Sequence, residues 1–531
     1  MKMGAEVLDV AIVGAGVSGA WCGWRLTDPA AGPGRRGAVA VFEAGDRVGG
    51  RLLSLELPGL PGVACELGGM RYTSSQRLVR WLVEDQLGLA RQPAPVAEAS
   101  NLAYLRGRRL RQGSLADPAV VPYDLAGADR GKTPDALLSE AVARIVPAVG
   151  SASGEALRKA VESAVFEGRP VWAQGFWNLL ARTMSHEAYR FAEEAGGYDT
   201  VMLNWNAADT IMLNFDFDPT VEFHRITPGF ETVPRQLAQR FEDQGGALHL
   251  RTRVRSVDVT LLDDGSTGVV LAVEDGTGGT RTVRARAVIL AMPRRSLELI
   301  EPTGVLADPH FRRLLTTVTP IPLFKAFVAY HEPWWESVGV TRGRSVTDLP
   351  LRQVYYWASG GAGHNAALLA TYDDTLNVGF WQGLATQAGV HELALGHVPP
   401  ERAREISDHL AALGDRARWR RFQTSPALVA EVHRQLVELH GVERAPAPYA
   451  AVYHDWSADP FGGGVNFWNR GVKSGETIPR MVSPVAGAPV YVCGEAYSDT
   501  QGWVEGALRT AELVLTDHLG LAPAPVAASP A

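Results

Sequence analysis

The run Asp9-Val10-Ala11-Ile12-Val13-Gly14-Ala15-Gly16-Val17-Ser18-Gly19 lies near the start of this 531-residue chain and joins an apolar stretch to a glycine-rich turn. The apolar residues predict a buried strand, and residues 20–26 after the turn predict a helix. In such a turn Gly14 allows the tight bend, Gly16 lets the backbone approach a pyrophosphate, and Gly19 lets helix and strand pack closely. The N–H groups of the first helical turn, which includes Ser18, attract phosphate. The pattern therefore predicts a dinucleotide-binding unit.

An acidic residue follows the second apolar run, where a dinucleotide ribose needs an acceptor. Residues 38–42 predict a strand, and Glu43, followed by Ala44, lies 24 residues after Gly19. A carboxylate at this position accepts hydrogen bonds from ribose hydroxyls. Residues 46–51 then place two glycines between arginines, which allows close backbone approach beside cationic groups. We therefore expect Gly50 and Arg51 to lie near phosphate.

A matching motif lies close to the other end of the chain. Residues 490–493 predict a strand that is followed by Gly494 and Glu495, and Gly502-Trp503-Val504 opens a predicted helix. With the amino-terminal motifs, and in this order, the sequence resembles the flavin amine oxidase family and, within it, the L-amino acid oxidase branch. The resemblance covers nearly the whole chain except about residues 95–220.

The resemblance implies an α/β fold (α+β overall). It combines a Rossmann-like FAD-binding domain of the glutathione reductase/p-hydroxybenzoate hydroxylase type with a mixed-sheet substrate domain and a helical insertion. We expect the discontinuous FAD-binding domain at 1–75, 225–320 and 480–520, and the discontinuous substrate-binding domain at 76–120, 201–224 and 321–479. The helical insertion is expected at 121–200 and a disordered tail at 521–531. Thr133-Pro134 predicts the start of a helix, and residues 102–110 predict a hairpin.

The same resemblance implies FAD as the cofactor, bound without a covalent link. Mitochondrial monoamine oxidases attach flavin through a cysteine, and Gly462-Gly463-Gly464 has none. The cage tyrosine that follows that cysteine is also missing, with Val465 in its place, and Phe467 or Trp468 is a candidate substitute. The candidate cofactor-binding residues are Gly14, Gly16, Ser18, Gly19, Glu43, Ala44, Gly50, Arg51, Gly69, Met70, Arg71, Val254, Gly494, Glu495, Gly502, Trp503 and Val504.

Arg71, in Glu66-Leu67-Gly68-Gly69-Met70-Arg71-Tyr72, indicates the class of substrate. The amine-only branch of the family has small or aromatic residues here, whereas L-amino acid oxidases have an arginine. The planar guanidinium matches a carboxylate through two parallel hydrogen bonds. A site built in this way can reject a simple amine by a factor of ~10⁴. The alternatives for Arg71 are a phosphate contact and a surface ion pair.

Other candidate residues follow from the resemblance. Tyr356 is the candidate second ligand of the carboxylate, with Tyr355 as the close alternative. The Gly502 carbonyl would accept a hydrogen bond from the substrate amine, and Trp503 would form a wall of the site. Lys325 lies in an apolar run, and a buried lysine needs a partner. In the family such a lysine holds a water against flavin N5, so Lys325 is a catalytic candidate, and Trp503 is the other. The alternative for Lys325 is a solvent-facing lysine on an edge strand.

The activity implied is FAD-dependent oxidation of an L-amino acid to the imino acid, then to a 2-oxo acid and ammonia, with oxygen reduced to hydrogen peroxide. The alternatives are an amino-acid 2-monooxygenase that gives an amide, a primary-amine or polyamine oxidase, and a non-catalytic flavin scaffold. The substrate side chain stays open: Asp209 and Glu222 could meet a basic amino acid, and the many tryptophans an aromatic one.

Composition adds little. A net charge of −7 and a hydrophobic content of 46% give no reason to expect nucleic acid or a membrane as a partner. Cys22, Cys65 and Cys493 have no spacing typical of a metal site or a disulfide. The first strand leaves no room for a cleavable signal peptide, so we expect a cytoplasmic protein, as a homodimer acting on a small amino acid and oxygen.

Overall fold

The glycine-rich run forms the predicted strand–turn–helix unit, in which β1 (Leu8–Val13) leads into α1 (Val17–Thr27). The computed structural model describes residues 7–125, 127–215, 221–359, 361, 363–414, 418–458 and 463–526. Gly14 has a φ of 102°, and a Cβ on it would lie 2.7 Å from the Ala291 carbonyl oxygen, so only glycine makes this turn. A Cβ on Gly19 would lie 1.9 Å from the Gly14 carbonyl oxygen, so α1 packs directly against the turn.

β1 lies inside a sheet of order β12-β2-β1-β15-β14-β13, with β23 beside β15. β12, β2, β1, β15 and β23 run parallel, whereas β13, β14 and β15 pair antiparallel. β12 and β13 are separate strands, because Arg251 between them has a φ of 51°. The strands are β2 (Val39–Phe42), β12 (Ala247–His249), β13 (Thr252–Leu261), β14 (Thr267–Asp275), β15 (Thr280–Ala291) and β23 (Val490–Cys493).

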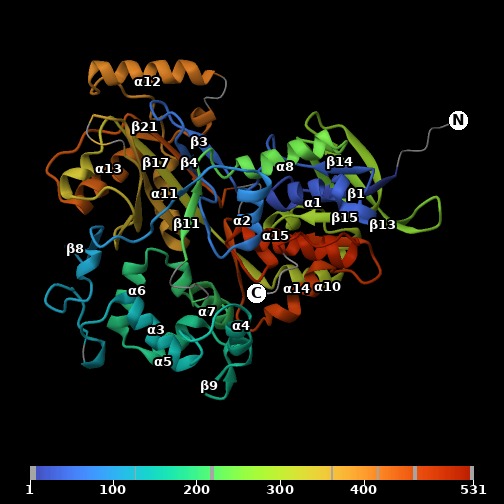
Figure 1. Ribbon diagram of the computed structural model, residues 1–531, viewed down its shortest axis with the longest axis horizontal. Coiled ribbons are helices and arrows are strands. Elements are labelled where there is room, and N and C mark those ends of the chain that lie inside the picture. The colour runs from blue at the N-terminus through green and yellow to red at the C-terminus, as the bar shows by residue number, and fades with distance from the viewer. Residues whose placement is uncertain are drawn as a thin grey trace.

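Both faces of the parallel part of this sheet are buried, as its continuous apolar runs require. Val10 and Ile12 pack with α1, α8 (Thr232–Asp243) and α15 (Val504–Leu513) on one face. Ala11 and Val13 face the opposite core, which α10 (Pro309–Leu315) helps to cover. This half of the molecule lies on the right in Figure 1.

A second sheet, of order β21-β17-β20-β19-β18-β7-β8, lies on the left in Figure 1. α11 (Thr375–Ala385) and α13 (Pro426–His440) pack on one face of it. β7 and β8 form the predicted hairpin, and β17 lies between β21 and β20, so it is not an edge strand. The strands are β7 (Leu102–Leu105), β8 (Arg108–Arg111), β17 (Leu323–Tyr330), β18 (Arg344–Thr347), β19 (Gln353–Ala358), β20 (Ala366–Asp374) and β21 (Ala450–Asp455).

The helical insertion is present and extends beyond the expected residue 200. It contains α3 (Pro134–Ile145), α4 (Gly154–Ser163), α5 (Phe176–Thr183), α6 (His186–Gly196) and α7 (Ala207–Phe215). The helix predicted at Thr133-Pro134 is confirmed, since the Thr133 hydroxyl caps α3 by accepting a hydrogen bond from the Ala136 N–H. The expected assignment of 201–224 to the substrate domain is wrong for α7, because Ile211 and Met212 are buried in the same core as α3 to α5.

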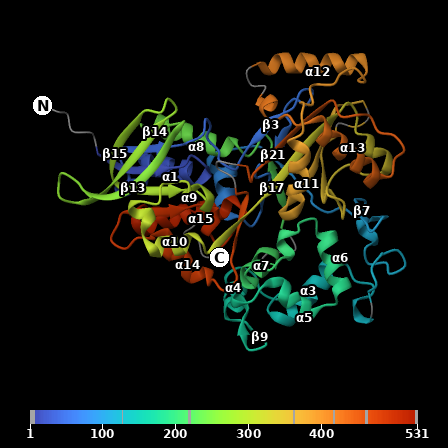
Figure 2. The same ribbon diagram turned by 180° about the vertical axis from the view of Figure 1, so that it is seen from behind.

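Short elements join the two sheets. β11 (Phe223–Ile226) pairs with β5 (Tyr72–Thr73) and β6 (Arg91–Pro93), and it lies between the two halves in Figure 1. In Figure 2, as in Figure 1, α12 (Pro400–Leu413) lies at the outer end of the second half. The remaining elements are β3 (Ser54–Glu56), β4 (Ala64–Glu66), β9 (Val165–Phe166), β10 (Arg169–Pro170), β16 (Val318–Ile321), β22 (Val465–Trp468), α2 (Arg77–Arg80), α9 (Arg294–Glu298) and α14 (Ser474–Val482).

The expected disordered tail is wrong for residues 521–526. Leu521 and Ala524 are buried in the core around α1, and the Glu512 carboxylate accepts a hydrogen bond from the Ala524 N–H at 2.8 Å. Ala522, Pro523 and Pro525 between and after these residues are exposed, so Leu521 and Ala524 anchor the segment. Residues 527–531 lie outside the described part. Among the described residues, no helix has the length and apolar character needed to cross a bilayer.

Candidate active site

A cavity of about 560 Å³ begins at the carboxyl ends of the parallel strands and reaches the second sheet. Its lining includes the Gly14–Gly16 turn at one end and Lys325 and Tyr372 at the other. Ligands of open α/β sheets bind at this edge of the strands. The lining also contains most of the candidate cofactor residues: Gly14, Gly16, Ser18, Glu43, Ala44, Gly50, Arg51, Gly69, Val254, Gly494, Glu495, Gly502, Trp503 and Val504.

The first end of the cavity suits a dinucleotide. The amino-terminus of α1 has no side-chain cap, which leaves N–H groups and the positive end of the helix dipole for phosphate. A Cβ on Gly50, which has a φ of 56°, would lie 3.1 Å from the Gly16 Cα, so side chains are excluded where the two loops meet. The Glu43 carboxylate accepts hydrogen bonds from the Ala15 and Gly45 N–H groups, both at 2.7 Å, and is therefore fixed at the rim.

Arg51 and Glu495, which are 444 residues apart, form an ion pair at 2.5 Å on the cavity wall. The Arg51 guanidinium also donates to the Gly464 carbonyl at 2.8 Å. Glu495 accepts a further hydrogen bond from the Gly502 N–H at 3.0 Å, which ties the loop before α15 to the same point. The two ends of the chain are therefore joined at the cavity, and Arg51 is already paired with a carboxylate.

Lys325 is buried and points into the other end of the cavity. Its ammonium donates to the carbonyl oxygens of Gly68, at 2.5 Å, and Glu66, at 3.3 Å, and lies 4.3 Å from the centre of the Tyr372 ring. Burial lowers the pKa of Lys325 to about 7 and raises the pKa of the Glu66 carboxyl to about 8. The alternative of a solvent-facing lysine is wrong.

Arg71 lies among aromatic side chains beside this end of the cavity. Its guanidinium carbon is 4.7 Å from the centre of the Phe223 ring and 5.6 Å from that of Tyr355. The centre of the Phe223 ring in turn lies 6.5 Å from that of Trp503, which lines the cavity. No carboxylate forms an ion pair with Arg71 in the part of the chain that the structure describes, so the surface ion pair considered for it is not observed there. The guanidinium has the Tyr355 hydroxyl as a hydrogen-bond partner but no carboxylate counter-ion among the described residues.

Tyr356, the candidate second ligand, faces away from the site. Its hydroxyl pairs with Ser345 Oγ at 2.6 Å and His440 Nε2 at 2.9 Å in the core under α13. Successive side chains of a strand point to opposite faces, so Tyr355 is the one beside Arg71. Burial alone would raise the pKa of the Tyr355 hydroxyl, but the nearby Arg71 and Arg344 hold that pKa below its usual value.

Some candidates lie away from the cavity lining. Gly19 packs under the turn, and the Met70 side chain is buried in the core of the second sheet. Asp209 accepts a hydrogen bond from Ser474 between α7 and α14, and the Glu222 side chain is 73% exposed next to His224, so neither lines the cavity. Gly462 lies outside the described residues, and Val465 lines the cavity.

Three aromatic residues near Arg71 were not predicted: Tyr198, Phe223 and Tyr372. Tyr372 alternates with buried residues on β20, the strand between β17 and β19, so strand pairing could have indicated it. Tyr198 comes from the helical insertion, and no local sequence signal places it beside β19. Among the described residues, no group of three or more His, Cys, Asp and Glu side chains could hold a metal ion.

A dinucleotide site at the strand ends, joined to a buried lysine and an aromatic-flanked arginine, defines a nucleotide-cofactor oxidoreductase. The chain belongs to the flavin-containing amine oxidoreductase family, whose model matches residues 22–384 and 397–514. It is therefore a flavin-dependent oxidoreductase with FAD as its cofactor, and the cavity residues described above fit that cofactor.

Similar proteins extend this finding. Aplysianin-A from Aplysia kurodai is 26% identical over 97% of this chain and 90% of its own. Achacin from Lissachatina fulica is 24% identical over 96% of this chain and 93% of its own length. An L-amino-acid oxidase from Siganus canaliculatus is 21% identical over 97% of this chain and 88% of its own length. These relatives span the insertion as well as both sheets.

Solved structures share the fold. Putrescine oxidase bound to putrescine has a TM-score of 0.63 at 17% identity, covering 96% of this chain and 99% of its own. Cyclohexylamine oxidase from Brevibacterium oxydans has a TM-score of 0.62 at 19% identity, covering 97% and 99%. At these identities the likeness supports the architecture alone.

Proposed function

We propose that this chain is an FAD-dependent L-amino acid oxidase. It would convert an L-amino acid to the imino acid, which water hydrolyses to a 2-oxo acid and ammonia, while oxygen is reduced to hydrogen peroxide. The chemistry that FAD supplies when bound is the two-electron oxidation of the C–N bond and the delivery of those electrons to oxygen. Full-length relatives that bear the name L-amino-acid oxidase support this proposal.

The observation that carries the proposal is the environment of Arg71. Its guanidinium carbon lies 4.7 Å from the centre of the Phe223 ring and 5.6 Å from that of Tyr355, and no described carboxylate neutralises it. A partly buried cation without a counter-ion is costly, so an arriving carboxylate gains both charge pairing and two parallel hydrogen bonds. A simple amine offers neither and brings a second positive charge instead.

The remaining residues of the site would orient the substrate. The Gly502 carbonyl would accept a hydrogen bond from the amine, and the hydrogen bond from the Gly502 N–H to Glu495 holds this residue at the cavity wall. Trp503 and Tyr372 would enclose the substrate from two sides of the cavity. Lys325 would hold a water or a proton at Nζ, which the Glu66 and Gly68 carbonyls and the Tyr372 ring fix at the wall of the cavity. Fixed orientation of this kind can supply several kcal/mol of catalysis.

A peroxide-coupled screen tests the proposal. The purified holoenzyme is given the L-amino acids, several D forms and the amines made by decarboxylating each L-amino acid. The proposal predicts peroxide and 2-oxo acid from one or more L-amino acids and much less from the matched amines. Peroxide from amines alone would identify an amine oxidase, and amide with carbon dioxide would identify a monooxygenase.

A further inference from the structure

The loop after α6 brings a tyrosine of the helical insertion to the substrate side of the molecule. The Tyr198 hydroxyl lies 3.4 Å from that of Tyr355, which borders Arg71. The Tyr198 ring packs edge-on against Tyr372, with 5.3 Å between ring centres, and Tyr372 lines the cavity. Tyr198 therefore touches one neighbour of Arg71 and one wall of the cavity.

The hydrogen bonds of this group leave Tyr198 able to change partner. The Tyr355 hydroxyl donates to Gln353 Oε1 at 3.2 Å, so its oxygen is the acceptor in its contact with Tyr198. A separation of 3.4 Å is long for a hydroxyl–hydroxyl hydrogen bond, whose usual length is about 2.7–2.8 Å. Such a weak bond costs little to exchange for a stronger one to an anion bound at Arg71.

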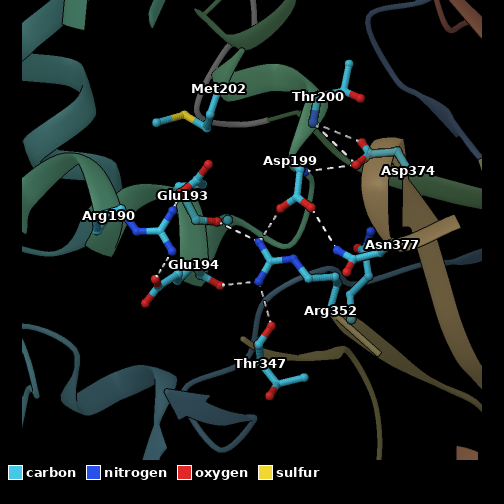
Figure 3. Close-up of polar contacts among 12 residues, drawn as sticks. Arg190, Glu193, Glu194, Asp199, Thr200, Met202, Thr347, Arg352, Asp374 and Asn377 are labelled. Atoms are coloured by element: carbon cyan, nitrogen blue, oxygen red, sulfur yellow. Dashed lines mark hydrogen bonds and ion pairs between the residues drawn. The ribbon is translucent and has the colours of Figure 1, made fainter. Parts of the chain in front are cut away.

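A buried polar network fixes the residue next to Tyr198, as Figure 3 shows. Asp199 forms an ion pair with Arg352 at 2.8 Å and accepts a hydrogen bond from Asn377 at 2.8 Å. The Asp374 carboxylate accepts hydrogen bonds from the Asp199 N–H, at 3.1 Å, and the Thr200 N–H, at 3.2 Å. Both the side chain and the backbone of Asp199 are therefore held by the second sheet.

Arg352 itself is anchored to the end of α6. Only 5% of it is exposed, and its φ of 49° is an unusual conformation for a residue with a side chain. Its guanidinium donates to the carbonyls of Glu193 at 2.9 Å, Glu194 at 3.3 Å and Thr347 at 2.7 Å. A cation at the carboxyl end of a helix is stabilised by the helix dipole. The strained, buried arginine thus locks the insertion to the sheet one residue from Tyr198.

We propose that Tyr198 is a specificity-determining residue, whose hydroxyl binds the substrate carboxylate together with Arg71. Asp199 and Arg352 are positioning residues that hold Tyr198 at this point. The inference rests on the proposed function and extends it, because it gives the helical insertion a direct part in the choice of an amino acid over an amine.

The test measures kcat/KM of the holoenzyme for an L-amino acid and its decarboxylated amine in wild type, Tyr198→Phe and Tyr104→Phe. Tyr104 is the matched control, since its hydroxyl donates to Glu438, on α13. A hydrogen bond to a charged group corresponds to a change of about tenfold or more. We expect Tyr198→Phe to lose about that factor for the amino acid, mainly through KM, and to keep the value for the amine.

The outcomes separate the two proposals. A wild type that oxidises only amines would overturn the proposed function. A wild type selective for amino acids, with Tyr198→Phe unchanged or reduced equally for both substrates, would overturn the role of Tyr198 alone. Tyr104→Phe should match wild type for both substrates.

The positioning role has its own test. Asp199→Asn removes the charge that Arg352 pairs with, so it should shift the amino acid-to-amine ratio in the same direction as Tyr198→Phe. In the double variant the two effects should not add, because both act on one hydroxyl. An unchanged ratio, or full additivity, would refute the positioning role. Asn377→Ala, which removes one hydrogen bond to Asp199, gives the same comparison if Asp199→Asn does not fold.

Discussion

Replacing Arg71 by methionine should lower the selectivity for an amino acid over its amine more than any other single substitution. The substitution keeps an unbranched side chain between Phe223 and Tyr355 but removes the guanidinium. Two hydrogen bonds from a charged donor contribute about 3 kcal/mol at the lower end of their range. That is roughly a 150-fold loss in kcat/KM for the L-amino acid. The amine should keep its rate or gain, because a like charge has been removed.

The assay follows peroxide from matched amino acid and amine pairs, with FAD content and melting temperature measured on every variant. The change should leave no carboxylate unpaired among the described residues, so the loss of stability should be limited to the ring contacts, about 0.5–2 kcal/mol. Arg240→Met is the control. Arg240, on α8, also lies over an aromatic ring: its guanidinium carbon is 5.9 Å from the centre of the Trp24 ring. Equal losses for both substrates would refute the role of Arg71.

Three further predictions concern the strand faces, the phosphate end and the lysine. Tyr356→Phe should lower the free energy of unfolding by about 1–3 kcal/mol in urea denaturation, because buried partners lose their hydrogen bond, yet leave substrate selectivity unchanged; altered selectivity would contradict the assignment of faces. Gly50→Val should lower the FAD content of the purified protein, because a Cβ at residue 50 would lie 3.1 Å from the Gly16 Cα. Full FAD occupancy would contradict the view that the loops of Gly16 and Gly50 must meet closely to bind the cofactor. Lys325 is a cation below its pKa of about 7 and neutral above it, so a carboxylate inhibitor should bind more weakly as pH rises through 7. Lys325→Met should bind the inhibitor without that inflection, and an inflection that persists in this variant would assign it to another group.

Local patterns were sufficient to predict the parallel strands β1, β2 and β23 of the dinucleotide half. β1, β2 and β23 come from apolar runs that end in glycine or acid, and each forms within one or two residues of the expected position. A glycine that must make a tight turn and an acid that must follow a strand are short-range requirements, so they are visible in the sequence itself. The division into domains elsewhere depended on contacts that a linear pattern does not carry.

Three differences have a common physical origin. Tyr356 was preferred to Tyr355 although they are adjacent, and only the register of β19 decides which one faces Arg71. α7 belongs to the helical insertion rather than the substrate domain, because its buried face packs there. The end of the chain is packed at Leu521 rather than disordered. Each outcome depends on which surface another part of the chain presents, hundreds of residues away in the last case.

Tyr198 shows the same limit at the site. Its position follows from the ion pair between Asp199 and Arg352, which joins residues 153 apart in sequence. Neither residue belongs to a motif, so no local pattern indicates that they act together. The homodimer and the cytoplasmic location stay predictions.

A crystal structure of the FAD-loaded enzyme with a bound carboxylate inhibitor tests the central claim most directly. The account predicts that the carboxylate lies on the Arg71 guanidinium, between Phe223 and Tyr355, with its remaining atoms directed toward Trp503 and Lys325. A carboxylate bound elsewhere in the cavity, with Arg71 turned away or bound to the cofactor phosphates, would contradict it.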